Sequence, residues 1–95
     1  MRFSTSCKTF LIDGREANFT FNVLEVEDQV TAFFIPCEDD AVAKTLTRFQ
    51  TIYFEYSLDA QAWVQASEIE LSDDLRSFFK SHLPVLRKRT VRRKA

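Results

Sequence analysis

Residues 2–26 read RFSTSCKTFLIDGREANFTFNVLEV, two runs rich in β-branched and aromatic residues on either side of Asp13-Gly14. Aspartate followed by glycine between two such runs is a strong β-hairpin signal, because both residues tolerate the positive φ angles that tight turns require. The sequence therefore predicts two antiparallel strands, at residues 2–12 and 16–26, joined by a turn.

Two loop lengths fit this turn, and they bring different side chains together. A three-residue loop at residues 12–14, with Gly14 in the left-handed conformation, places Cys7 opposite Phe19, whereas a two-residue loop places Lys8 there. Burial favours the three-residue loop, because it puts the apolar side chains of both strands on one face. Those side chains are Phe3, Cys7, Leu11, Ala17, Phe19, Phe21 and Val23.

The rest of the chain contains three more strand patterns. Residues 29–35 end in Phe33-Phe34-Ile35, a run of apolar side chains that needs cover on both faces and so predicts a central strand. Residues 51–57 and 62–71 are typical of two further strands, joined in a second hairpin across residues 58–61.

Two helices are expected beside these strands. Acidic residues at 38–40 follow Pro36 and can start a short middle helix, whose apolar positions are Val42, Leu46 and Phe49. Ser72 is a good N-cap residue for an amphipathic helix over residues 73–83.

The fold class expected from these elements is α+β and mainly β. It is a five-stranded twisted antiparallel sheet, or a small partly open barrel, with a short middle helix and a C-terminal amphipathic helix.

Charge divides the chain into two parts. Residues 1–86 contain seven Lys or Arg and all fourteen Asp or Glu, a net charge of −7, whereas residues 87–95 contain six Lys or Arg and no acid, a net charge of +6. We therefore expect one folded domain at residues 1–84 and a basic, flexible tail at residues 85–95.

Composition also predicts where the protein resides. The chain has no apolar run long enough to span a bilayer, and its first residues lack the apolar block of a secretory signal. Cys7 and Cys37 are thirty positions apart in a body with enough apolar residues to fold alone, which favours reduced thiols. A soluble, cytoplasmic protein without a membrane span is expected.

Several classes of chemistry are disfavoured by what the chain lacks. Gly14 is the only glycine, and phosphate-binding loops need several. His82 is the only histidine, and neither cysteine belongs to a closely spaced pair that would suit zinc. We therefore expect no catalytic residues, no metal site and no cofactor.

The one positive functional signal is a cluster of six cations: Arg87, Lys88, Arg89, Arg92, Arg93 and Lys94. Such a segment binds phosphate backbones by releasing counterions, and arginine adds bidentate contacts with phosphate oxygens. Nucleic acid, either RNA or DNA, is the expected partner. An acidic protein, an anionic membrane surface, the acidic body of the chain itself, or no partner at all are the alternatives.

The spacing of Arg89 and Arg93 resembles the RxxxR motif of PilZ domains, small β-barrels that bind a cyclic dinucleotide. The resemblance implies a barrel with a nucleotide site. Two features depart from that family: its arginines precede the barrel, and Thr9 and Leu11 stand where its second motif has an acid and a serine before the glycine.

The sequence thus favours a non-enzymatic interaction module. Its acidic body contacts a protein partner, or a second copy in a homodimer, and its basic tail binds nucleic acid or another polyanion. The alternative is a β-barrel, dimeric or not, that binds a nucleotide-like or anionic small molecule. A hydrolase or transferase that uses surface carboxylates is the third possibility.

Overall fold

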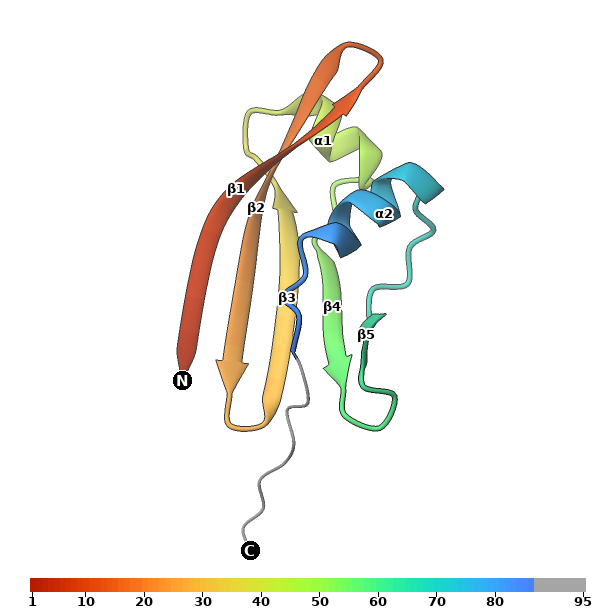
Figure 1. Ribbon diagram of the computed structural model, residues 1–95. Coiled ribbons are helices and arrows are strands. Elements are labelled where there is room, and N and C mark those ends of the chain that lie inside the picture. The colour runs from red at the N-terminus through yellow and green to blue at the C-terminus, as the bar shows by residue number, and fades with distance from the viewer. Residues whose placement is uncertain (87–95) are drawn as a thin grey trace, which may run out of the picture.

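The computed structural model describes residues 1–86; residues 87–95 are not described. These described residues form five strands and two short helices (Figure 1). In chain order they are β1 (Arg2–Ile12), β2 (Arg15–Val26), β3 (Gln29–Pro36), α1 (Ala41–Leu46), β4 (Ile52–Ser57), β5 (Ala62–Gln65) and α2 (Asp73–Ser81).

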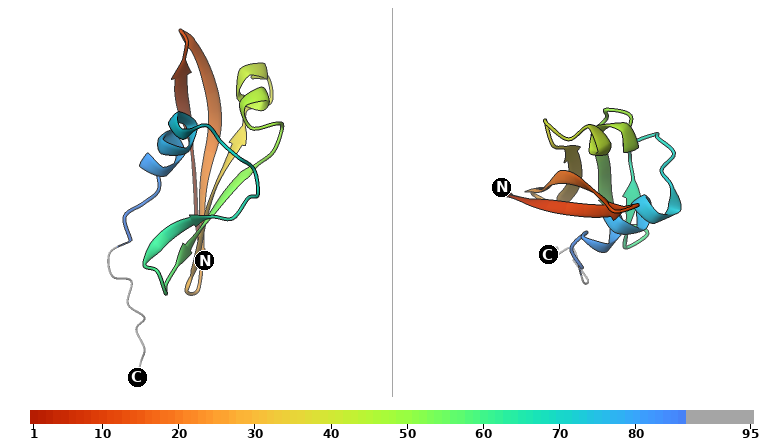
Figure 2. Two further views of the ribbon diagram at one scale, coloured as in Figure 1. Left: turned by 90° about the vertical axis from the view of Figure 1, so that its right-hand side faces the viewer. Right: turned by 90° about the horizontal axis from the view of Figure 1, so that it is seen from above.

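The five strands make one open antiparallel sheet in the order β1-β2-β3-β4-β5. The predicted antiparallel sheet is confirmed, with β3 at its centre. The described sheet is not closed into a barrel, since β1 and β5 are its two edges and do not pair. In the side view of Figure 2 the two helices lie on opposite sides of the long β1–β2 hairpin.

The hairpin has a two-residue loop, so the predicted three-residue register is wrong. Ile12 pairs with Arg15, and Phe19 lies opposite Lys8 instead of Cys7. Asp13 and Gly14 have φ angles of 49° and 74°. Positive φ at both loop residues defines a type I′ turn, whose twist matches that of the flanking strands. The turn geometry therefore sets the register and overrides the burial argument.

The register decides which side chains of the sheet form the core. Alternation along each strand directs the buried aromatic residues toward α2, on what is here called the α2 face. Phe79 of α2 is fully buried, with its ring centroid 4.3 Å from that of Phe34 and 5.1 Å from that of Phe19. The other buried apolar residues of the sheet are Ala17, Phe21, Val30, Ala32, Ile52 and Phe54.

The opposite side of the sheet, here called the outer face, is only partly covered. Phe33 is half-buried, and Ile35, Tyr53 and Val64 remain 39%, 43% and 50% exposed. The expectation that Phe33-Phe34-Ile35 needs cover on both sides is therefore wrong for the outer face, because α2 packs on one face alone. Figure 1 shows α2 lying across that one face.

Helix α1 is shorter than the sequence predicts, because the chain turns sharply at its end. Thr47 is the C-cap, and its hydroxyl donates a hydrogen bond back to the Ala43 carbonyl at 3.1 Å. Arg48 and Phe49 then adopt positive φ angles of 56° and 64°. Phe49, expected on the apolar side of the helix, is 74% exposed.

Strand β5 also ends earlier than predicted, at Gln65 instead of residue 71. The Gln65 amide turns toward its own chain and donates hydrogen bonds of 2.9 Å to the carbonyls of Ser67 and Ile69. These bonds stabilise an irregular segment that carries buried Ile69 and Leu71 into the core.

Helix α2 begins after Ser72, whose hydroxyl accepts a hydrogen bond from the Leu75 N–H. Residues 87–95 follow beyond the described part, so the expectation that this helix is the C-terminal element stays a prediction. Neither helix within residues 1–86 is long and apolar enough to cross a membrane.

The Phe79 side chain should dominate the stability of this fold. We expect Phe79→Ala to lower the free energy of unfolding by about 3–5 kcal/mol, because it leaves a cavity among the rings of β2, β3 and β4. Phe49→Ala, at an exposed ring, should change it by less than about 0.5 kcal/mol. Urea denaturation measures both values, and similar losses for the two variants would contradict the packing described here.

Candidate functional site

The six cations predicted to bind a polyanion, residues 87–89 and 92–94, lie outside the described residues. The structure does describe the segment that leads to them. The Trp63 indole N–H donates a 2.9 Å hydrogen bond to the Pro84 carbonyl, and the Tyr56 hydroxyl donates a 3.2 Å bond to the Leu86 carbonyl. The basic run therefore starts one residue after a point that is attached to β4 and β5.

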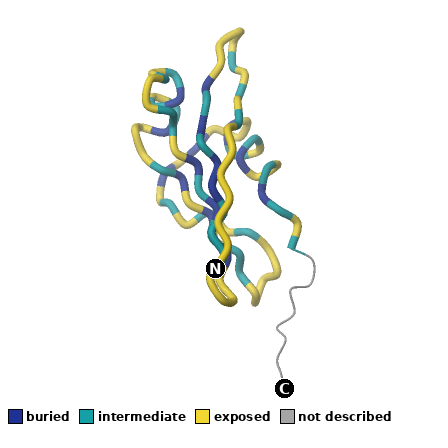
Figure 3. Tube along the Cα trace, turned by 90° about the vertical axis from the view of Figure 1, so that its left-hand side faces the viewer, coloured by how far each residue is buried: buried dark blue, intermediate teal, exposed yellow. Residues whose placement is uncertain are grey.

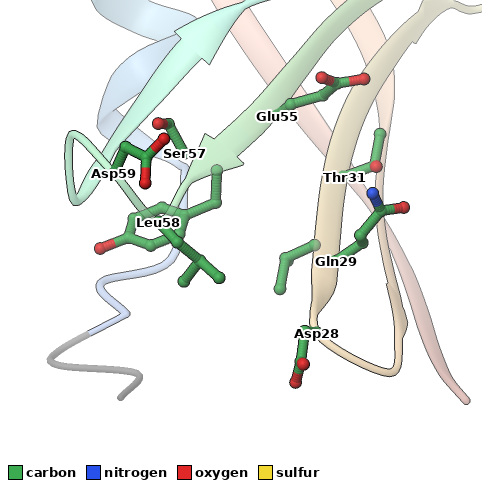
Figure 4. A pocket seen from close by; sticks show the side chains of 9 residues that line it. Asp28, Gln29, Thr31, Glu55, Ser57, Leu58 and Asp59 are labelled. Carbon is green, nitrogen blue, oxygen red and sulfur yellow. The ribbon is translucent and has the colours of Figure 1, made fainter. Parts of the chain in front are cut away.

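An acidic cleft of about 360 Å³ lies beside that attachment point. Tyr56, which holds Leu86, is one of its lining residues. Three carboxylates surround it, Asp28 from the β2–β3 turn, Glu55 from β4 and Asp59 from the β4–β5 turn (Figure 4). These acids are far apart in the sequence, so no local motif could have predicted that they share a cleft. Its charge would repel an anionic ligand and attract a cationic one.

A second concavity, a groove of about 460 Å³, lies on the α2 face between the first three strands and the segment after α2. Its apolar lining includes Phe21, Val23 and Val30, and Arg2 and His82 add polar groups. Burial lowers the pKa of the His82 imidazole, and the charge of Lys8 lowers it further. His82 is thus a neutral donor or acceptor at pH 7, and its ring packs against Phe78 at 4.8 Å between centroids.

Both cysteines are free, and they lie beside the same residue of β2. Cys7 pairs with Thr20 across the β1–β2 ladder, and the Cys37 sulfur lies 3.9 Å from the Thr20 hydroxyl. Cys7 is exposed, so the expectation that it faces the core is wrong. The two-residue turn places Lys8, and not Cys7, opposite Phe19. The described cysteines lie toward the outer face and His82 toward the α2 face, so they do not form a nucleophile–base pair.

The environment of Cys37 disfavours a reactive thiolate. Burial raises the pKa of its thiol, and Cys7 and Asp40 raise it further, while the hydrogen bond with Thr20 lowers it. A thiol with a raised pKa is mostly protonated at pH 7 and therefore a weak nucleophile.

The acids of the 38–40 cluster do not act together. Asp40 alone is engaged: its Oδ1 accepts a 2.9 Å bond from the Ala43 N–H, and its Oδ2 accepts bonds of 2.7 and 3.0 Å from the main-chain and side-chain N–H groups of Asn18. The bond from Ala43, followed by that from Asn18, lowers the pKa of this carboxyl. Asp40 thus caps α1 and ties it to β2. Across residues 1–86, no group of three or more His, Cys, Asp or Glu side chains could hold a metal ion.

The aromatic residues of the strands divide by face. Phe19, Phe34 and Phe54 are fully buried in the core. Phe33 and Tyr53 stack on the outer face with ring centroids 5.4 Å apart. Alternation directs no lysine or arginine of the five described strands to that face, and its acids are Glu16 and Glu55. This composition suits contact with protein better than with a phosphate backbone.

Comparison with known protein families, with curated protein sequences and with solved structures gave no match.

Asp40 should contribute to stability in a pH-dependent way. We expect Asp40→Ala to lower the free energy of unfolding by about 1–2 kcal/mol at pH 7, because it removes the N-cap acceptor of α1. Since folding lowers the pKa of this carboxyl below 3.8, the contribution is complete above pH 3.8 and is lost as the pH falls through the folded-state value.

Urea denaturation of both chains between pH 7 and pH 3 measures this difference. Asp39→Ala is the matched control, since the neighbouring carboxylate accepts none of the three bonds, and it should be close to neutral. A loss for Asp40→Ala that is equal at both ends of the pH range would contradict this assignment.

Proposed function

We propose that this protein is a non-enzymatic interaction module whose basic segment, residues 87–94, binds nucleic acid or another polyanion. The observation that carries the proposal is the separation of charge at Leu86, with −7 before it and +6 after it. Six cations within eight positions bind a phosphate backbone by releasing its counterions, and this needs no folded site.

The anchoring of residues 84–86 supports this role. Hydrogen bonds from Trp63 and Tyr56 hold Pro84 and Leu86, which precede the basic segment in the sequence, against the sheet. The carboxylates of Asp28, Glu55 and Asp59 line the acidic cleft beside Tyr56 and give the body a negative potential there. A polyanion is attracted by the segment and repelled by the body, so binding is confined to the segment.

The outer face supports the second half of the proposal, contact of the body with a protein partner. Ile35, Tyr53 and Val64 are exposed there on neighbouring strands, with Phe33 half-buried between them. Apolar and aromatic side chains without cations are typical of the centre of protein–protein interfaces. The module would thus link a protein partner to a polyanion, acting in the cytoplasm.

The salt dependence of binding tests the basic segment. We expect the full chain to bind a fluorescent duplex DNA or single-stranded RNA, with log K falling linearly with log[salt] at a slope of at most about −5 for duplex DNA. A chain that ends at Leu86 should lose both the affinity and the slope. Fluorescence anisotropy over a salt series measures both.

The matched control keeps the length of the chain and replaces the six cations by glutamine. It should behave like the shortened chain, because the interaction depends on charge. Equal affinity and equal slope for the full, shortened and glutamine-substituted chains would overturn the proposal.

A second candidate function is binding of a nucleotide-like or anionic small molecule in the apolar groove. Its volume of about 460 Å³ is in the range of small-molecule sites, and Arg2 and His82 provide polar groups beside the apolar wall. The ligand class is the one that the sequence predicted for a β-barrel, but here the ligand would bind to an open sheet.

Thermal unfolding in the presence of nucleotides and flavins tests the groove. A ligand at one hundred times its Kd stabilises the folded chain by about 2.7 kcal/mol and raises the Tm accordingly. Arg2→Ser, at the exposed rim, should reduce the rise for an anionic ligand, whereas Phe49→Ser, remote from the groove, should leave it unchanged. No rise with any compound, or an equal rise in both variants, would exclude this site.

A further inference from the structure

The long edge of the sheet, strand β1, is exposed along most of its length. Arg2 to Cys7, Thr9 and Leu11 are all exposed, and Figure 3 shows this strand running uncovered up the side of the molecule. Among residues 1–86 this eleven-residue strand pairs on one side only and has no proline or bulge, which makes it a template for another strand. The opposite edge, β5, has four residues.

The register of the hairpin shows which backbone groups of β1 are available. In the two-residue turn the Ile12 carbonyl faces the Arg15 N–H, so Ile12 and Arg15 form a hydrogen-bonded pair. Hydrogen-bonded and non-bonded pairs alternate along an antiparallel ladder. The even-numbered residues of β1 therefore bond to β2. The odd-numbered residues, Phe3, Thr5, Cys7, Thr9 and Leu11, direct their N–H and C=O groups to the open edge.

The same five residues have their side chains on the outer face, and their order is symmetric about Cys7. Phe3 and Leu11 are the large apolar members, 57% and 69% exposed, at equal distances from the centre. Two copies of β1 paired antiparallel about Cys7 would place Phe3 opposite Leu11 of the second copy, twice over. Thr5 would lie opposite Thr9, and Cys7 opposite its own copy.

Other registers fit less well. Shifting the pairing by one residue sets odd-numbered against even-numbered residues, whose groups are already bonded to β2. Centring the pairing on Lys8 keeps odd-numbered residues opposite one another, but it brings the two Lys8 ammonium groups together, and like charges destabilise a cross-strand pair. Centring it on Thr5 or Thr9 leaves Leu11 or Phe3 without a partner. The register about Cys7 uses the whole strand and makes about ten main-chain hydrogen bonds.

We propose that the protein forms a symmetric homodimer in which the β1 edges of two copies pair antiparallel about Cys7, joining two five-stranded sheets into one. The assembly closes at two copies, because each chain contributes its one long free edge. The inference does not depend on the basic segment. Leu86 lies near the start of β1, so the two copies of Leu86 would sit at opposite ends of the dimer. The dimer would therefore carry one basic segment after each of these two points.

Oxidation tests the register directly. Hydrogen-bonded pairs have Cα atoms about 5.5 Å apart, within the range that a disulfide spans. In a Cys37→Ser chain, diamide should take up two electrons and two protons from two Cys7 thiols and yield a covalent dimer that dithiothreitol reverses. A Cys7→Ser chain, which retains Cys37, should stay monomeric on a non-reducing gel. No covalent dimer from the first chain, or equal dimer from both, would overturn the proposal.

A charge exchange tests the same pairing without oxidation. The full chain should have about twice its mass of 11.1 kDa by light scattering. Phe3→Glu and Leu11→Lys alone should each raise the Kd of the dimer by about tenfold or more, because each affected pair occurs twice. The double variant should recover affinity, since the new carboxylate faces the new ammonium group across the edge.

Both positions are exposed, so the Tm of the diluted variants should match that of the parent chain. A chain that is monomeric at every concentration, or a double variant no tighter than the single ones, would show that β1 is not a dimer edge. Growth into assemblies larger than two would contradict the closed symmetry.

Discussion

The two positive φ angles at Asp13 and Gly14 are the constraint on which the rest of this structure depends. They close the hairpin with two residues and so fix which strand positions oppose each other. Because side chains alternate between faces, a shift of one residue would exchange the two faces of a strand. The turn therefore decides that Phe19 and Phe21 pack beneath α2, while Phe3, Cys7 and Leu11 point to the other side.

The two faces of the sheet differ in how far their side chains are buried. The α2 face holds a cluster of rings centred on Phe79, which touches aromatic residues of β2, β3 and β4. Helix α1 lies on the other side of the hairpin (Figure 2), but the apolar side chains of β3, β4 and β5 on the outer face remain partly in solvent. An apolar face that is only partly covered agrees with the proposed contact with a protein partner. Asp40 adds a long-range contact, because its carboxylate holds the start of α1 against Asn18.

Local signals in the sequence were sufficient for the positions of the strands, and insufficient for their edges and register. Asp13-Gly14 placed the first hairpin correctly, and the apolar run ending at Ile35 placed the central strand. The register failed because Cys7 and Leu11 were counted as core residues, although an edge strand can leave apolar side chains exposed. Strand β5 was too long in the prediction because the turn of the Gln65 amide onto Ser67 and Ile69 has no composition signal.

The candidate sites divide in the same way. The charge of the basic segment is readable from composition, whereas the cleft of Asp28, Glu55 and Asp59 depends on three turns and strands meeting at one end of the sheet. The groove beside His82 likewise combines β1 with the segment after α2. Such sites follow from the topology of the sheet, which brings together segments that are far apart in the sequence.

Proton NMR of the hairpin tests that register most directly. Non-bonded pairs in an antiparallel ladder bring their Cα atoms to about 4.5 Å, and their α-protons then give strong nuclear Overhauser effects. The structure predicts such cross-peaks between Cys7 and Thr20 and between Thr9 and Asn18. A strong α-proton cross-peak between Cys7 and Phe19 would contradict it, and with it the assignment of every side chain of β1 to its face.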